Sequence, residues 1–241
     1  MEALDPEAGA ILLVDKPLTW TSFNVVAKLR GALHKLCGHR VKVGHAGTLD
    51  PLATGLLILG TGKMTKRLPE LTAEDKEYVA ALTLGLVTAS YDAETPVQDP
   101  RSWAHISDDD VRSALNGFLG DIQQRPPNFS AKRFQGERGY NLSRWGEPVE
   151  MTPVSVRIDA LEVLGRRGAE VTVRVACSKG TYIRSLAHDL GQALGCGAYL
   201  SGLRRTRSGG FSVDDARTIA QWSEWLDHWA EGRQSPGIQK N

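Results

Sequence analysis

The sequence has few cysteines, no long apolar run and almost no net charge. Its three cysteines, Cys37, Cys177 and Cys196, are too few and too widely spaced for a disulfide framework or a zinc knuckle, which favours a reducing compartment. No apolar run approaches the roughly 18 residues that span a bilayer, and the N-terminus lacks the basic start and apolar stretch of a signal peptide. We therefore expect a cytoplasmic protein without a membrane segment.

The motifs of common nucleotide and hydrolytic sites are also missing. No strand pattern is followed by Gly-x-Gly-x-x-Gly, and no Gly-x-Ser-x-Gly elbow occurs. Residues 60–65 resemble a phosphate loop, but Leu57 stands where that motif needs glycine and Met64 where it needs serine or threonine. The histidines lack metal-ligand spacing. The sequence therefore predicts neither a metal nor a cofactor.

The net charge of +1 conceals an uneven distribution of basic residues. They gather in three groups, and the first residues of the chain are acidic. The groups are Arg30, His34, Lys35, His39, Arg40 and Lys42; Lys132, Arg133, Arg138 and Arg144; and Arg204, Arg205 and Arg207. Such clusters on a nearly neutral chain suit a localised phosphate-binding face, and equally three solvated surfaces.

Hydrophobic periodicity predicts an α+β fold around a mixed or largely antiparallel sheet, because strands and helices do not alternate strictly. The predicted strands are 11–14, 56–59, 76–84, 154–164, 170–177 and about 198–207. The predicted helices are about 22–36, 62–71, one that begins at Ser107, 181–194, and 212–231 with Ser212 as its cap. Residues 1–9 are expected to form a flexible tail, and the basic, aromatic stretch at about 124–152 an excursion that serves binding.

The most informative segment is Val-Gly-His-Ala-Gly-Thr-Leu-Asp-Pro-Leu-Ala-Thr-Gly at residues 43–55. Its glycines permit turns or close approach, and Pro51 biases Asp50 toward an extended backbone. The apolar run 56–59 then anchors the segment to the core. Asp50 is therefore placed on a rigid turn, where a catalytic group is positioned accurately. The commoner role of a lone aspartate in such a turn is structural.

A second segment, residues 177–186, leads from a buried strand into a helix. Tyr182 and Arg184 fall in the first turn of that helix. A guanidinium there could pair with Asp50, keep it ionised and fix its orientation. The alternative is a surface arginine beside a half-buried tyrosine, which is the commoner arrangement.

Six segments, in order along the chain, carry the motifs of one family. They are 13–17, 44–55, 75–78 with 84–85, 126–136, 177–184 and 195–205. In these segments the chain resembles the TruB family of tRNA pseudouridine synthases, which make pseudouridine at position 55 in the T-loop. The resemblance implies a pseudouridine synthase domain at 10–211 with an RNA-binding insertion at about 124–152. Residues 212–241 would be a C-terminal helix and tail, without a full PUA-type domain.

The resemblance implies an isomerase that converts uridine to pseudouridine without metal or cofactor. Asp50 would act on the sugar as a nucleophile or as a base, which the sequence leaves open. Tyr78 would stack on the extruded uracil, and Lys16 would support the loop or contact phosphate. The implied residues are Asp50, Arg184 and Tyr182 for catalysis; His45, Tyr78, Leu203 and Lys16 for substrate; and Lys132, Arg133, Arg144, Arg204 and Arg205 for RNA. The partner would be the T-stem-loop of tRNA, bound by a monomer.

The chain departs from the family pattern at two places. Residues 130–133 read Ser-Ala-Lys-Arg where the family usually has Ser-Ala-Leu-Lys, and Ala89 replaces an aspartate in the segment after the Tyr78 strand. Two other functions stay open. One is a non-catalytic tRNA-binding or folding protein. Asp50 and Arg184 argue against it, because a protein that only binds RNA gains nothing from a buried acid. The other is a glycosidase, which usually needs two carboxylates, and Ala89 removes the obvious second one.

Overall fold

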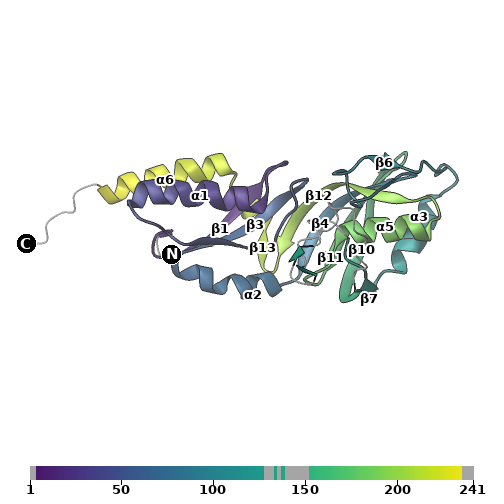
Figure 1. The fold of residues 1–241 in the computed structure, drawn as a ribbon, viewed down its shortest axis with the longest axis horizontal. Coiled ribbons are helices and arrows are strands. Elements are labelled where there is room, and N and C mark those ends of the chain that lie inside the picture. The colour runs from purple at the N-terminus through teal and green to yellow at the C-terminus, as the bar shows by residue number, and fades with distance from the viewer. Residues whose placement is uncertain (1–3, 128–132, 135–136, 139–151, 235–241) are drawn as a thin grey trace, which may run out of the picture. The chain divides into compact units, whose positions relative to one another are not determined.

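The computed structural model describes residues 4–127, 133–134, 137–138 and 152–234 (Figure 1). Within them the chain forms two compact units, one of residues 4–74 with 204–234 and one of residues 75–203. Strand β12 (Ala198–Ser208) begins in the second unit and ends in the first. Helices and antiparallel strand pairs occur in both units, so the expected α+β class is confirmed.

The first unit is built around β3 (Ala53–Thr61), with which β1 (Ile11–Lys16) and β2 (Val43–Ala46) pair antiparallel. Leu56 and Ile58 pack with Leu71 of α2 (Leu68–Ala73). Alternation turns Leu57 and Leu59 to the opposite face, where both are fully buried. Helices α1 (Ser22–Cys37) and α6 (Ile219–Gln234) lie side by side there (Figure 1). Helices on both faces explain the continuous apolar run.

The ends of α1 match the prediction closely. Thr21 caps its first turn in a reciprocal capping box with Asn24, and Gly38 ends it with a left-handed φ of 72°. The 3-10 helix η1 (Gly62–Arg67) and α2 replace the single helix expected at 62–71. A flexible tail is expected at residues 1–9. From Asp5 onward the structure has a turn, in which the Gly9 N–H donates to the Asp5 carbonyl.

The predicted start of the last helix is wrong. Ser212 belongs to β13 (Phe211–Ser212), which pairs with β12, and its side chain caps the 3-10 helix η2 (Val213–Asp215). Arg217 then lies beside β1: its N–H donates to the Leu13 carbonyl, and its own carbonyl accepts from the Asp15 N–H. Because these bonds satisfy an edge strand and hold the chain extended, α6 begins only at Ile219.

The second unit is an antiparallel sheet covered by helices on one face. Its strands are β7 (Gly120–Gln124), β10 (Val154–Arg167), β11 (Glu170–Cys177) and β4 (Lys76–Leu84), which pair in that order, with β12 on the far side of β4. Helices α3 (Asp108–Asn116) and α5 (Ile183–Ala193) pack on the alternating apolar side chains of β4 and β11. The short pairs are β5 (Val87–Thr88) with β6 (Val97–Gln98), and β8 (Arg133–Phe134) with β9 (Glu137–Arg138).

Candidate active site

Asp50 lies in the loop between β2 and β3, and the backbone beside it is held by hydrogen bonds. The hydroxyl of Ser22, at the start of α1, donates to the Leu49 carbonyl at 3.1 Å and accepts from the Leu49 N–H at 2.8 Å. The Ala53 N–H donates to the Asp50 carbonyl at 3.1 Å and closes a turn. Both backbone groups of the residue before Asp50 are therefore fixed to a helix.

Lys16, at the end of β1, supports the same loop. Its side chain is fully buried, and its Nζ donates to the carbonyls of Pro17 at 3.0 Å, Trp20 at 2.5 Å and Pro51 at 3.4 Å. Burial lowers the pKa of Lys16 to about 8, although the negative charge of Asp50 opposes that shift. These contacts support the first role expected for Lys16, which is to hold the loop. A phosphate contact stays a prediction that the structure does not support, because the side chain is fully buried.

Arg205 clamps the loop from β12. Its Nε donates to the Leu56 carbonyl at 2.7 Å and its Nη2 to the Gly47 carbonyl at 3.2 Å. A Cβ on Gly55, whose φ is 96°, would lie 2.3 Å from the Arg205 carbonyl oxygen, so only glycine fits this crossing. The RNA-binding role predicted for Arg205 stays a prediction that the structure does not support, because its side chain is 1% exposed and its donors face the loop backbone.

Arg204, the preceding residue, points to the other face of β12, as strand alternation requires. Its guanidinium forms a bidentate pair with Asp15, at 3.0 and 2.8 Å, and its side chain is 42% exposed. The sequence could have indicated this difference, because two consecutive residues of a strand point to opposite faces of the sheet.

His45 of β2 is half-buried near the loop. Burial lowers its pKa, and the positive charge of Arg205 lowers it further. Its Nδ1 is buried and has no hydrogen-bond partner among the described residues. A buried polar atom of this kind calls for a partner that the described residues do not supply. The neutral imidazole can therefore offer a hydrogen bond to a bound molecule.

In the second unit, Tyr182 is the N-cap of α5 rather than a residue of its first turn. Its N–H donates to Oε1 of the buried Gln124 at 2.7 Å, and Nε2 of Gln124 donates back to the Tyr182 carbonyl at 3.0 Å. The Ser185 hydroxyl donates to the Arg125 carbonyl at 2.7 Å. The start of α5 is thus tied to the end of β7.

Arg184 is buried and lies 3.7 Å from the carboxylate of Asp92, which is also buried. Its Nη1 also donates to the Ser90 carbonyl at 3.5 Å. Asp92 accepts in turn from the Ser90 hydroxyl at 2.6 Å and the Glu94 N–H at 2.9 Å. Sequence reasoning considered only the acid replaced by Ala89 in this segment and missed Asp92. A buried guanidinium needs a carboxylate partner, and that requirement could have pointed to Asp92. Asp50 and Arg184 belong to different units, so their pairing stays a prediction.

Tyr78 and Leu203 are half-buried on β4 and β12, and both pack against the core that α5 covers. Tyr78 shares its face of β4 with Ala80 and Leu82. The remaining RNA-binding predictions fall elsewhere. Lys132 and Arg144 lie outside the described residues, and Arg133 is described only as a backbone position of β8.

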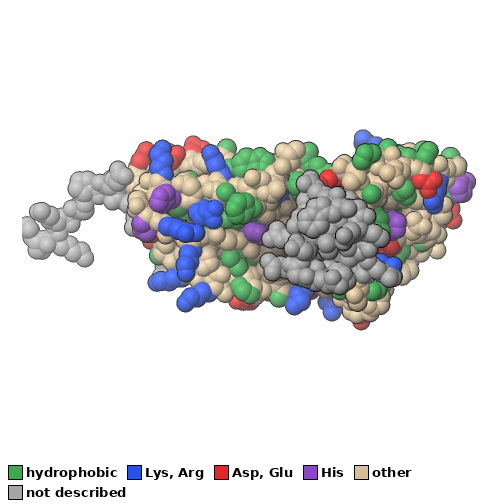
Figure 2. All heavy atoms as spheres, viewed as in Figure 1, with side chains coloured by type: hydrophobic (Ala, Val, Ile, Leu, Met, Phe, Trp, Pro, Cys, Tyr) green, Lys and Arg blue, Asp and Glu red, His purple; other side chains and the backbone are tan. Residues whose placement is uncertain are grey.

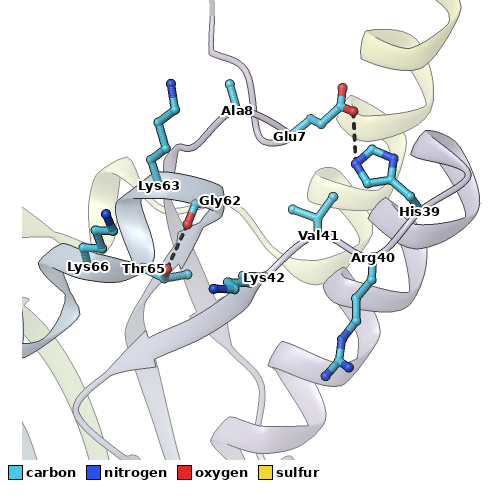
Figure 3. Close-up of a pocket in the computed structure, with 10 residues that line it drawn as sticks. All are labelled: Glu7, Ala8, His39, Arg40, Val41, Lys42, Gly62, Lys63, Thr65 and Lys66. Atoms are coloured by element: carbon cyan, nitrogen blue, oxygen red, sulfur yellow. Dashed lines mark hydrogen bonds and ion pairs between the residues drawn. The ribbon is translucent and has the colours of Figure 1, made fainter.

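The first unit also carries a basic pocket of about 380 Å³. Lys63 and Lys66 project from η1 on one side, and His39 lies on the other, 3.4 Å from Glu7 (Figure 3). Arg40 and Lys42, from the first predicted basic cluster, complete its charged lining. Lys, Arg and His side chains gather over the first unit on the face shown in Figure 2. Such a surface suits a polyanion.

The side chains of the described residues also limit the kind of site. Within those residues, no group of three or more His, Cys, Asp or Glu side chains could hold a metal ion. None of the described helices is long and apolar enough to cross a membrane. The first unit therefore offers the Asp50 carboxylate on a clamped loop together with the half-buried His45, and the second unit offers the buried Arg184 together with Tyr78 and Tyr182.

Two solved structures of multi-component complexes are similar to this chain over most of its length. One is a chain of an H/ACA ribonucleoprotein bound to a substrate RNA containing 2′-deoxyuridine, with a TM-score of 0.69 and 30% identity over 95% of this chain and 56% of that chain. A chain of a Cbf5-Nop10-Gar1 complex matches with a TM-score of 0.71 and 32% identity over 94% of this chain and 57% of that one. This chain thus spans little more than half the length of those solved chains. Its fold is that of a pseudouridine synthase.

The sequence matches are more specific. The model of the TruB family pseudouridylate synthase N-terminal domain matches residues 34–183, and that of the tRNA pseudouridylate synthase B C-terminal domain matches residues 184–236. The tRNA pseudouridine synthase B of Phocaeicola vulgatus is 49% identical over 220 residues, 91% of this chain and 94% of that protein. That of Chlorobium luteolum is 49% identical over 234 residues, 96% and 81%. The chain belongs to the TruB family, which confirms the resemblance in its motifs.

Proposed function

We propose that this protein isomerises uridine to pseudouridine in tRNA, at position 55 in the T-loop, with Asp50 as the catalytic carboxylate and without metal or cofactor. Membership of the TruB family and relatives named tRNA pseudouridine synthase B support the reaction and the tRNA substrate. The observation that carries the assignment to Asp50 is the clamped loop. Ser22, Lys16 and Arg205 all direct their polar groups to the backbone around this one carboxylate.

In the reaction, the bond from uracil N1 to the ribose C1′ breaks and a bond from C5 to C1′ forms. The proton that leaves C5 is balanced by protonation of N1, so no external reagent is consumed. Asp50 acts on the sugar as a nucleophile or as a base. Arg184 holds the carboxylate ionised, Tyr78 stacks on the extruded uracil, and Tyr182 and Leu203 shape the pocket. His45 offers the flipped nucleotide its Nδ1, which has no hydrogen-bond partner among the described residues.

The RNA is held largely through phosphates and by shape. The basic pocket of the first unit and the exposed edge of Arg204 supply positive charge for those contacts. Lys132, Arg133 and Arg144 in the insertion at about 124–152 supply more. Residues 10–211 form the catalytic domain, residues 212–241 add a helix and tail, and the protein acts as a cytoplasmic monomer.

The test is release of tritium from a T-loop transcript that carries 5-tritiated uridine. D50N should abolish release and leave tRNA affinity within several-fold, because the amide keeps the size of the carboxylate and removes its charge. The matched control is D109N, since Asp109 is a carboxylate whose side chain is 94% exposed at the start of α3. Substantial release by D50N would refute its catalytic role. No release by the unaltered protein, with binding intact, would instead identify a tRNA-binding or folding protein.

A further inference from the structure

The turn that holds Asp92 contains a strained residue. Tyr91, between Ser90 and Asp92, has a φ of 64°. A residue other than glycine adopts this left-handed backbone conformation at an energetic cost. The conformation persists only where surrounding contacts stabilise it. The Tyr91 carbonyl accepts from the Leu200 N–H at 2.9 Å, which fixes the backbone of the turn to β12. That bond does not explain why the residue is a tyrosine.

The tyrosine ring has a specific partner on α5. It stacks on the imidazole of His188, with 3.9 Å between ring centroids and 13° between planes. Burial lowers the pKa of His188, so the ring is neutral at neutral pH. Its Nδ1 is buried and makes no hydrogen bond to the described residues. The stack on Tyr91 is thus a specific contact of this imidazole.

His188 lies one helical turn after Arg184 on the same helix. The turn at residues 88–92 therefore meets α5 at two successive levels. At the first, the Asp92 carboxylate and the Ser90 carbonyl approach the Arg184 guanidinium. At the second, the Tyr91 ring covers His188. Rotation of the turn about either contact would break the other.

We propose that Tyr91 and His188 are positioning residues: their stack fixes the turn at residues 88–92 on α5, so that Asp92 holds the Arg184 guanidinium in one orientation. The proposal rests on the proposed function, in which Arg184 serves Asp50. Neither ring touches the substrate in this scheme. Removal of the stack should therefore lower turnover and leave RNA affinity and stability largely intact.

The first experiment separates the ring from the backbone strain. Y91F keeps the ring and should retain kcat within twofold. Y91A removes the ring and keeps the strain, and Y91G removes both. Aromatic pairs of this kind correspond to roughly a two- to tenfold change in an equilibrium. Both Y91A and Y91G should therefore lower kcat by about three- to tenfold at a nearly unchanged KM. Recovery of kcat in Y91G would show that only the backbone matters and would overturn the proposal.

The second experiment asks whether the effect passes through Asp92. H188A should lower kcat as Y91A does, and the Y91A/H188A double variant should be no worse than either single variant. In a D92N background, Y91A should have no further effect on kcat. Multiplicative reductions in either pair would overturn the proposal, and H188A with D92N provides the same test if Y91A does not fold.

The control is W225A, which breaks another aromatic pair, Trp222 with Trp225 at 5.5 Å in the first unit, and should leave kcat unchanged. The proposed function and this inference fail differently. If the unaltered protein releases no tritium, the function is wrong. If it releases tritium and Y91A equals it in kcat, the positioning role alone is wrong.

Discussion

Replacement of Arg205 by methionine tests whether this buried side chain serves the loop or the RNA. Methionine has a similar reach and fills much of the same space, but it donates no hydrogen bond. The change leaves the Leu56 and Gly47 carbonyls without the donors at 2.7 and 3.2 Å. Each buried acceptor left unpaired costs about 1–3 kcal/mol. We therefore expect R205M to lower the free energy of unfolding by about 2–4 kcal/mol, or the melting temperature by roughly 5–15 °C.

The same change should lower kcat, because Gly47 belongs to the loop that carries Asp50. The affinity for tRNA at a fixed salt concentration should stay within about twofold. The decisive measurement is the slope of log affinity against log salt, whose magnitude falls by about 0.7–0.9 for each phosphate that the protein no longer neutralises. R205M should leave this slope unchanged, whereas R204M, at the exposed neighbour proposed to contact RNA, should reduce it. A reduced slope in R205M with unchanged stability and kcat would refute the loop-support reasoning.

Two further predictions follow from the same loop. G55A should lower the free energy of unfolding by more than about 2 kcal/mol in urea titrations, because its Cβ would meet the Arg205 backbone at 2.3 Å with a φ of 96°. G31A, in α1 with nothing within 4 Å of the added atom, should be neutral or stabilising, and equal stabilities of the two variants would contradict the close-packing argument. Burial lowers the pKa of Lys16 from an ordinary 10.5 to about 8 in the folded protein. Between pH 8 and 10.5 the unfolded chain therefore binds more protons than the folded protein. The stability of the unaltered protein relative to K16M should therefore rise from pH 8 to 10.5, and a flat or falling difference would contradict the burial of a charged ammonium.

Local sequence patterns predicted the regular elements well where packing follows periodicity. Residues 76–84 alternate, and they form β4 with one face on the core. The helix at about 22–36 has both a cap and an apolar face, and α1 matches it within a residue at its end. The helix expected from Ser212 failed because residues around Arg217 pair with β1. No local pattern announces a hydrogen bond to a strand so distant in the sequence.

The candidate site divides in the same way. The motif around Asp50 identified the family, and its glycines and proline indicated a constrained turn. The sequence did not reveal that Arg205 faces inward, because a basic residue on a strand is buried or exposed according to which face the sheet covers. It also did not single out Asp92, whose importance comes from its distance to Arg184. The Tyr91–His188 stack joins residues that are far apart in the chain, so periodicity could not indicate it.

The amino-acid sequence alone determined the α+β class, most element positions, the family and the carboxylate that the reaction is proposed to use. The class and the element positions follow from local physics, namely side-chain periodicity and backbone limits at glycine and proline. The family and the carboxylate follow from the resemblance of short contiguous motifs to those of known relatives. Only the tertiary structure decided which cations support the loop and which stay exposed, and which acid accompanies Arg184. Burial and charge pairing depend on neighbours brought together by folding, and no stretch of sequence contains that information by itself.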